Sequence, residues 1–167
     1  MNVKEFVSIP EERMRLLRAD PRIINKIQEL THAKIKLQDD ISIDCKDPII
    51  RHRLKEVFHA FGRGFDSDTA LNLLDEDYIL EVIEIPEYAG KSPNRQKILR
   101  ARVIGREGKS KKKIEKDCDV KISVYGKTVS IIGKWDKINL ARESVEKLLS
   151  GSKHSSVYRF LKERKLS

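Results

Sequence analysis

The sequence predicts an α+β fold built from two copies of one β-α-α-β-β-α unit. The first observation is an internal repeat: Arg13–Leu17 align with Arg100–Ile104 when the 167-residue chain is moved by 87 positions, and Ile27 and Lys34-Ile35 then fall on Ile114 and Lys121-Ile122. The second is periodicity, since apolar residues in each copy recur at strand spacing in some segments and at helix spacing in others. We therefore expect two small domains.

The copies differ in length near their start. Phe6–Pro10 match Val82–Pro86 at a shift of 76, so the second copy carries 11 extra residues after its first strand. These fall around residues 88–93, where Gly90 and Pro93 predict a loop.

The elements of the second copy follow in order. Residues 78–85 alternate as a strand, 93–104 form a helix opened by Pro93, and 109–118 form a second helix. Alternating residues on both sides of Tyr125-Gly126 predict a β-hairpin over 120–131. Apolar residues from Ile138 to Leu149 predict a longer closing helix.

Two further helices complete the expected organisation. Asp66-Ser67-Asp68 is typical of a cap for a short helix between the copies. After Gly151, serines precede a segment with Val157, Phe160 and Leu161 on one side, which predicts an amphipathic helix capped by serine. We expect four parts: residues 1–65, a linker helix at 66–77, residues 78–151, and a C-terminal helix at 152–167.

Charge is divided unevenly between the halves. Residues 1–90 carry 13 Lys and Arg against 18 Asp and Glu, a net charge of −5, whereas residues 91–167 carry 22 against 8, a net charge of +14. An acidic partner is expected for the second half. Cys45 and Cys118 have no partner at disulfide or zinc spacing, and no long apolar run is present, so we expect a soluble, cytoplasmic protein.

The most informative segment is Val103-Ile104-Gly105-Arg106-Glu107-Gly108-Lys109. Glycines at both corners allow a tight turn that brings backbone N–H groups close to an anion, and the following helix directs its positive dipole end to the same place. This arrangement predicts a seat for a phosphodiester backbone.

That layout resembles the KH domain, whose Gly-x-x-Gly loop clamps about four nucleotides of single-stranded nucleic acid. The resemblance implies two tandem type I KH domains, each with three antiparallel strands covered on one face by helices. It places the RNA backbone on Gly105, Arg106, Glu107, Gly108 and Lys109, with Arg100 and Arg102 along the approach and Lys112 ranking below Lys109. Bases are expected to lie on a groove floor of Val103, Ile104, Ile114 and Ile122, although core packing is the commoner role for each of these residues alone.

The corresponding loop of the first copy is Arg18-Ala19-Asp20-Pro21. Neither corner is glycine, an acid is present, and Pro21 lacks a backbone donor. We expect this copy to keep the fold without the RNA grip. Its acidic half is then free to contact a protein, and Arg13, Arg15 and Arg18 could still touch RNA elsewhere. The alternative is that this copy lost its function by drift.

An enzymatic alternative arises because Gly108-Lys109-Ser110 resembles the end of a nucleotide-binding P-loop. That motif requires glycine where this chain has Val103, and a preceding strand where this chain predicts a helix. The four histidines, His32, His52, His59 and His154, have no Cys or carboxylate at ligand or catalytic spacing. We therefore expect neither an active site nor a cofactor or metal.

The most specific resemblance rests on longer motifs. The chain is similar to the archaeal members of the Partner-of-Nob-One family in Arg102–Lys109, Ile122–Val129 and the ending His154–Leu161. The resemblance implies a factor in small ribosomal subunit maturation that holds the 3′ end region of the rRNA. It implies contacts with the α subunit of translation initiation factor two and with the endonuclease that trims that end. A general KH-type mRNA regulator, a nucleotide hydrolase and a protein-only scaffold are the alternatives.

Overall fold

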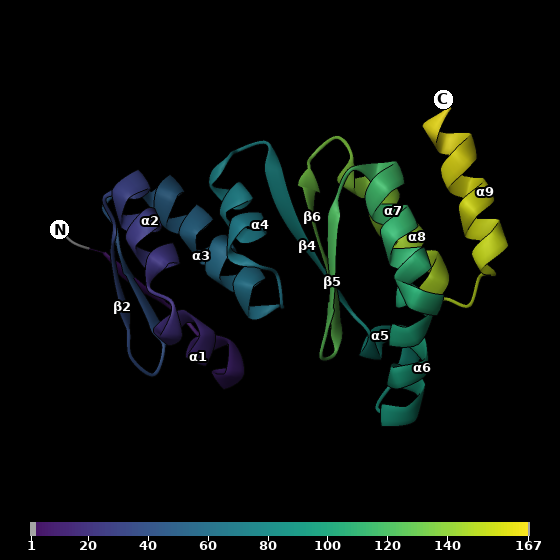
Figure 1. Cartoon of the computed structure of the whole chain (residues 1–167), viewed down its shortest axis with the longest axis horizontal. Helices are drawn as coiled ribbons and strands as arrows, with labels where there is room; N and C mark the ends of the chain where they lie inside the picture. The colour runs from purple at the N-terminus through teal and green to yellow at the C-terminus, as the bar shows by residue number, and fades with distance from the viewer. Residues whose placement is uncertain (1–2, 167) are drawn as a thin grey trace. The chain divides into compact units, whose positions relative to one another are not determined.

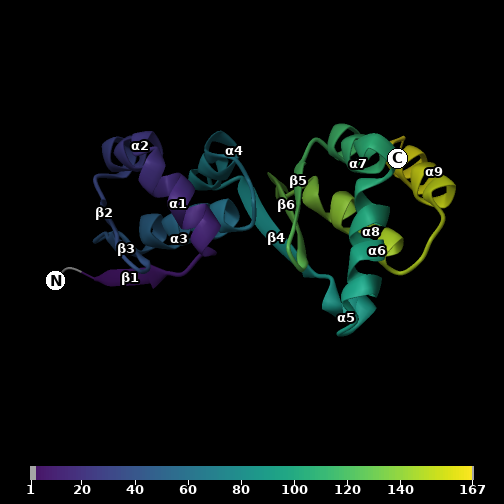
Figure 2. The ribbon, with the colours of Figure 1, turned by 60° about the horizontal axis from the view of Figure 1, so that its bottom comes forward.

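The computed structural model describes residues 3–166, which form two compact units, one reaching to Glu76 and one beginning at Asp77 (Figure 1). We call them unit 1 and unit 2. Each contains a three-stranded antiparallel sheet with helices against one face, as Figure 2 also shows. The predicted α+β fold with two β-α-α-β-β-α copies is confirmed.

Unit 1 is built around a sheet of order β1-β3-β2. Its elements are β1 (Lys4–Val7), α1 (Glu11–Ala19), α2 (Arg22–Thr31), β2 (Lys34–Leu37), β3 (Ile41–Asp44), α3 (Pro48–Gly62), α4 (Ser67–Leu71) and the 3₁₀ helix η1 (Asn72–Leu74). Helices α1, α2 and α3 bury Met14, Ile27 and Phe58. Asp66 caps α4 as predicted, since its carboxylate accepts from the N–H of Thr69 at 2.8 Å.

Unit 2 has a sheet of order β4-β6-β5. Its elements are β4 (Tyr78–Glu84), α5 (Pro86–Ala89), α6 (Pro93–Ile104), the 3₁₀ helix η2 (Arg106–Gly108), α7 (Lys109–Cys118), β5 (Lys121–Tyr125), β6 (Thr128–Lys134), α8 (Ile138–Leu149) and α9 (His154–Lys165). The C-terminal helix α9 packs on this unit through Val157 and Leu161, both fully buried. An amphipathic C-terminal helix is thus confirmed.

One local prediction holds only in part, and another was wrong. The segment after β4 is not all loop, because Pro86 opens a one-turn helix that ends at Gly90, whose φ is 68°. The serines do not cap α9: its N-cap is Lys153, without a side-chain cap. Ser155 and Ser156 instead lie within the first turn of the helix, where their hydroxyl groups are past the capping position.

The repeat register of the first helix also needs correction. The shift of 87 pairs Leu16 with Val103, yet Leu16 is 51% exposed while Val103 is fully buried. Downstream of the loop the register holds, since Ile27 and Ile114 are both fully buried. The register therefore changes at the loop, which differs in length between the units.

A shared arginine contact identifies the register before the loop. In unit 1, Arg13 donates through Nε and Nη2 to two backbone carbonyls at and just beyond the end of α3; in unit 2, Arg102 donates through the same two atoms to two carbonyls at and beyond the end of α8. The acceptors are Phe61 and Phe65 in unit 1, and Leu148 and Ser152 in unit 2. By this contact Arg13 is the counterpart of Arg102, not of Arg100.

Candidate nucleic-acid interface

Helix α6 is stopped by Gly105. Its N–H donates to the Ala101 carbonyl at 2.8 Å, and its φ of 76° and ψ of 173° turn the chain out of the helix. This combination of angles is essentially restricted to glycine. Two further residues of the loop have positive φ, Glu107 at 56° and Gly108 at 75°. The backbone conformation of the loop therefore depends on its glycine corners.

The two glycines are needed for different reasons. A β-carbon on Gly105 would lie 2.6 Å from Cβ and 2.8 Å from the backbone N of Ser110, which is fully buried. Gly105 thus allows α7 to pack directly against the loop. Beside Gly108, the nearest atom to such a β-carbon is Cε of Lys112 at 3.6 Å, an ordinary contact, so only the positive φ favours glycine there.

The N-terminus of α7 offers backbone donors to an anion. Its N-cap is Gly108, which has no side chain to accept from the first N–H groups of the helix. The exposed side chains of Arg106 and Lys109 flank this position, and the Lys112 side chain reaches back toward Gly108. A phosphate here would meet helix N–H groups, the helix dipole and three cations. The exposed carboxylate of Glu107 opposes them.

The two predicted approach arginines are engaged inside unit 2. Arg100 donates to the Gly126 carbonyl at 3.1 Å, at the β5–β6 turn. Arg102 bonds the carbonyls beyond α8, and its own carbonyl lies 2.9 Å from Nε2 of His154. Arg102 thereby joins α6 to the start of α9. This packing role was not apparent from the sequence.

The predicted groove floor is mostly core. Val103 and Ile114 are fully buried and Ile122 is 4% exposed, because α6, α7 and β5 press these side chains into the centre of unit 2. Ile104 is the member of the set that a base can reach, at 37% exposure. The apolar periodicity therefore identified core residues, and of the four only Ile104, beside the loop, is exposed.

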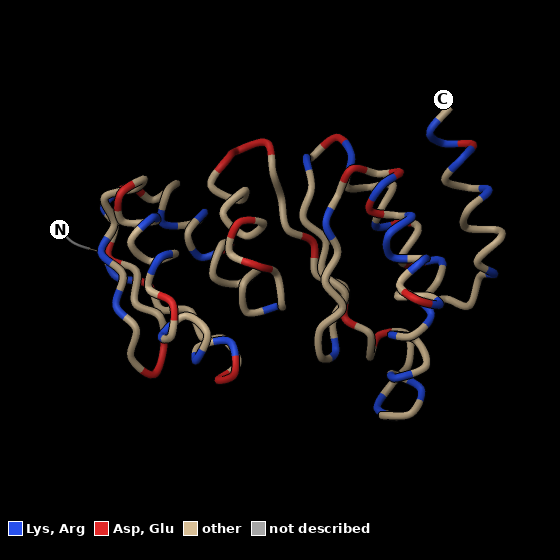
Figure 3. The backbone as a smooth tube through the Cα atoms, viewed as in Figure 1, with Lys and Arg blue, Asp and Glu red and all other residues tan. Residues whose placement is uncertain are grey.

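The cations of unit 2 gather on α7 and α9 as well as at the loop (Figure 3). On α7, two lysines are matched one turn later by acids: Lys111 lies 3.8 Å from Glu115, and Lys113 lies 3.0 Å from Asp117. Lys109, Lys112 and Lys116 are exposed and form no salt bridge with any residue of the described chain.

The equivalent loop of unit 1 already holds an anion of its own. The Asp20 carboxylate accepts from the backbone N–H of Arg22 at 3.1 Å and from its guanidinium at 2.8 and 2.7 Å. The hydrogen bond from the Arg22 side chain is the main cause, and the one from its backbone the next, of a lowered Asp20 pKa of about 2. A carboxylate of the protein thus accepts from the first backbone N–H group of α2.

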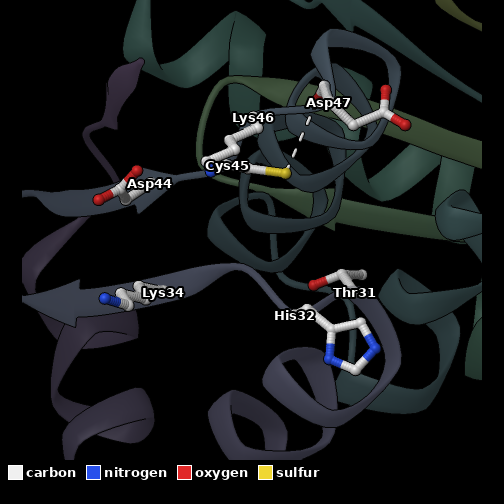
Figure 4. Close-up of a pocket in the computed structure, with 7 residues that line it drawn as sticks. All are labelled: Thr31, His32, Lys34, Asp44, Cys45, Lys46 and Asp47. Carbon is white, nitrogen blue, oxygen red and sulfur yellow. Dashed lines mark hydrogen bonds between the residues drawn. The ribbon is translucent and has the colours of Figure 1, made fainter. Parts of the chain in front are cut away.

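A hollow in unit 1 brings a histidine and a cysteine to one place that their spacing did not reveal (Figure 4). It is lined by Thr31, His32, Lys34, Asp44, Cys45, Lys46 and Asp47. The Cys45 thiol donates to the Asp47 carbonyl at 3.7 Å, while the His32 imidazole lies on the facing side. The hydrogen bond of the thiol thus goes to backbone.

Residues 3–166 lack two other features, a metal-binding cluster and a membrane-spanning helix. This part of the chain contains no cluster of three or more His, Cys, Asp or Glu side chains suited to a metal ion. It also contains no helix with the length and apolarity needed to cross a membrane.

Known proteins are similar to the second half of this chain and to nearly its whole length. Residues 79–166 match a family model described as a eukaryotic type KH domain (KH-domain type I), the second such domain of PNO1. A KH domain-containing protein of Methanocaldococcus jannaschii is 36% identical, over 96% of this chain and 74% of that protein. The pre-rRNA-processing protein PNO1 of Coccidioides immitis is 30% identical over 91% of this chain, which spans 63% of that longer protein.

Two solved structures are also similar over nearly the whole chain. A crystal structure of an a/eIF2α, aDim2p and rRNA complex from Pyrococcus horikoshii contains a chain with a TM-score of 0.90 and 33% identity, covering 99% of this chain and 96% of that one. Dim2p from the same organism, crystallised separately, gives a TM-score of 0.87 and 34% identity over 97% and 99% of the two chains.

Proposed function

This chain belongs to the PNO1, or Partner-of-Nob-One, family of type I KH-domain proteins, and from that premise we propose that it is a single-stranded RNA-binding adaptor in small ribosomal subunit maturation. It holds the 3′ end region of the small-subunit rRNA and assists its processing. The observation that carries this proposal is the Gly105–Gly108 loop, which leaves the N-terminus of α7 without a side-chain cap in the half of the chain that bears a net charge of +14.

The proposed grip works through backbone and charge. The sugar-phosphate chain lies on the N–H groups of the loop and of the first turn of α7, with Arg106, Lys109 and Lys112 neutralising its charge. Ile104 supplies apolar contact for a base. Because phosphate contacts carry no sequence information, base choice falls to polar edges near β5.

We assign different roles to the parts of the chain. Residues 78–151 are the RNA-binding domain, and residues 1–65 are a KH copy that keeps the fold without the phosphate seat, with 66–77 as linker and 152–167 as the C-terminal helix. The whole acts as a non-catalytic clamp: it keeps the rRNA strand extended and presents the processing site to other proteins.

The partners follow from the same premise. The complex of a/eIF2α, aDim2p and rRNA from Pyrococcus horikoshii supports rRNA and the α subunit of translation initiation factor two as partners of this chain. The endonuclease that trims the rRNA 3′ end is the third proposed partner. The proposed setting is the cytoplasm.

Binding to an unpaired oligonucleotide of the small-subunit rRNA 3′ end, at several salt concentrations, tests the proposal. Changing Gly105 and Gly108 together to Asp places two carboxylates where the phosphate is to bind and strains the loop. We expect affinity to fall at least about 100-fold. The slope of log affinity against log salt should also become shallower, by roughly 0.7 for each phosphate that the variant no longer neutralises.

The matched control is Gly90→Asp with Gly151→Asp. Both glycines lie in unit 2 and both have positive φ, so the control adds equal charge and positive-φ strain away from the loop. Nothing lies within 4 Å of a β-carbon placed on either, so it does not reproduce the overlap of Gly105 with Ser110, and both variants are first checked for folding by circular dichroism. We expect it to bind nearly as the unaltered chain does. Equal binding by the loop variant and the unaltered chain would refute the proposed grip.

A further inference from the structure

Helix α9 and the C-terminal half of α7 enclose a groove on unit 2 that the proposed grip does not use. Its lining is Lys113, Asp117, Tyr158, Arg159, Lys162, Lys165 and Leu166. Four of these residues are cations and one is an acid. We call this the α7–α9 groove. Figure 3 shows blue Lys and Arg segments along both helices.

The single acid organises two of the cations. The Asp117 side chain is only 13% exposed and lies 3.0 Å from Nζ of Lys113 and 3.7 Å from Nζ of Lys165. The Lys113 ammonium also sits 5.5 Å from the centre of the Tyr158 ring. One carboxylate shared between two ammonium groups holds both in place while leaving the pair with net positive charge.

The remaining two cations are not neutralised by the fold. Arg159 and Lys162 are exposed, and within residues 3–166 neither has a carboxylate in salt-bridge range. Tyr158, half-buried, and Leu166, 81% exposed, add apolar surface to the same lining. Aromatic surface among unpaired cations is the composition of a platform for single-stranded nucleic acid.

Lysines on α7 connect the groove to the glycine loop. Lys109, Lys112, Lys113 and Lys116 stand at positions i, i+3, i+4 and i+7, so they share one face of the helix. Like charges at this spacing repel and lower the stability of a helix. A bound polyanion relieves that repulsion, and a strand leaving the loop meets these lysines before it reaches α9.

We propose that the α7–α9 groove is a second contact for the RNA strand held by the glycine loop: Arg159 and Lys162 take phosphates beyond the clamped nucleotides, and Tyr158 offers a ring for a base. This inference rests on the proposed function and extends it. Continuity of charge from the loop favours RNA over an acidic protein segment as the occupant.

The test compares two oligonucleotides of the same rRNA 3′ end, one of about five nucleotides and one of about 15. The variant is Arg159→Glu with Lys162→Glu. We expect it to bind the long strand about tenfold more weakly than the unaltered chain, with a salt slope shallower by roughly 1.4, the value for two neutralised phosphates. The short strand should bind both proteins alike.

The charge-matched control is Lys26→Glu with Lys46→Glu, two exposed lysines of unit 1, which should leave both affinities near those of the unaltered chain. If the Glu variant fails to fold, Arg159→Gln with Lys162→Gln should give the same length dependence with a smaller loss. Undiminished binding of the long strand, as expected if the groove takes a protein, overturns the inference. Equal weakening on both lengths also overturns it.

Failure of the underlying function gives a different pattern. In that case the unaltered chain binds the short strand no better than the Gly105→Asp, Gly108→Asp variant does. If the short strand binds and depends on the loop while the groove variant has no effect, the clamp stands and the second contact alone is refuted.

Discussion

In unit 2 the helix before the loop stops at Ile104, two residues after Arg102, whereas in unit 1 helix α1 continues to Ala19, six residues after the equivalent Arg13. Unit 1 thus keeps helix where unit 2 has its glycine turn. Only Asp20 and Pro21 then separate α1 from α2. The arginine contact that fastens the helix is the same in both units, so two different loops follow the same support.

The two loops also differ in what accepts hydrogen bonds at the start of the next helix. In unit 1 the Asp20 carboxylate accepts from the backbone N–H and from the guanidinium of Arg22. In unit 2 the equivalent position at α7 has a glycine N-cap and cations around it. The same fold therefore carries an internal carboxylate before one helix and a glycine N-cap before the other.

The largest effect expected on stability distinguishes the two glycines of the Gly105–Gly108 loop. Gly105→Asn should lower the free energy of unfolding of unit 2 by roughly 3 kcal/mol, because asparagine does not adopt the Gly105 angles and its β-carbon would overlap Ser110. Gly108→Asn should cost less than about 1 kcal/mol, since asparagine tolerates the left-handed region. Denaturant unfolding measures both; equal losses would contradict the distinction.

A smaller effect tests the shared support. Arg102→Ala and Arg13→Ala should each destabilise their own unit by roughly 2 kcal/mol, through loss of two charged hydrogen bonds to backbone carbonyls. Arg100→Ala, the matched control, should cost less than about 0.5 kcal/mol, since Arg100 makes one exposed bond. Amide hydrogen exchange resolves the two units. A large loss of stability for Arg100→Ala with none for Arg102→Ala would instead support the shift of 87, which pairs Arg13 with Arg100.

The smallest effect concerns the pH dependence of unit 1. The folded pKa of Asp20 lies at about 2, below its ordinary 3.8, because Arg22 stabilises the carboxylate. Its contribution to stability is therefore complete above pH 3.8 and disappears as the pH falls toward 2. Carboxyl NMR titration should find this low pKa, and Asp20→Asn should remove the corresponding part of the acid dependence. A measured pKa of Asp20 near 3.8 would show that Arg22 does not stabilise this carboxylate, and would contradict the prediction.

Sequence patterns predicted the fold because they report on burial. Alternation around Tyr125-Gly126 and the helical period from Ile138 located elements correctly, since each must turn apolar residues toward one core. The same property made the groove prediction weak, because Val103, Ile114 and Ile122 satisfy that period by lying in the core. Periodicity alone does not distinguish a core residue from a groove floor.

Contacts between distant segments could not be predicted from the sequence. Arg102 resembles one more cation near a phosphate loop, and only the fold brings it to carbonyls 46 and 50 residues away. The α7–α9 groove likewise joins Lys113 to a helix some 45 residues later, so neither helix indicates it alone. The one-turn helix α5 was not predicted, because Gly90 indicates the turn that follows the helix and not the helix itself.

Arg102 connects the Gly105–Gly108 loop to the C-terminal helix α9. Its guanidinium holds the carbonyls that lead into α9, its own carbonyl meets His154, and Gly105 follows three residues later. In the proposed clamp, a force on the bound strand would thus act on the last helix as well as on the glycine turn. Shortening the protein at its carboxyl end should consequently weaken the proposed grip although its residues remain intact.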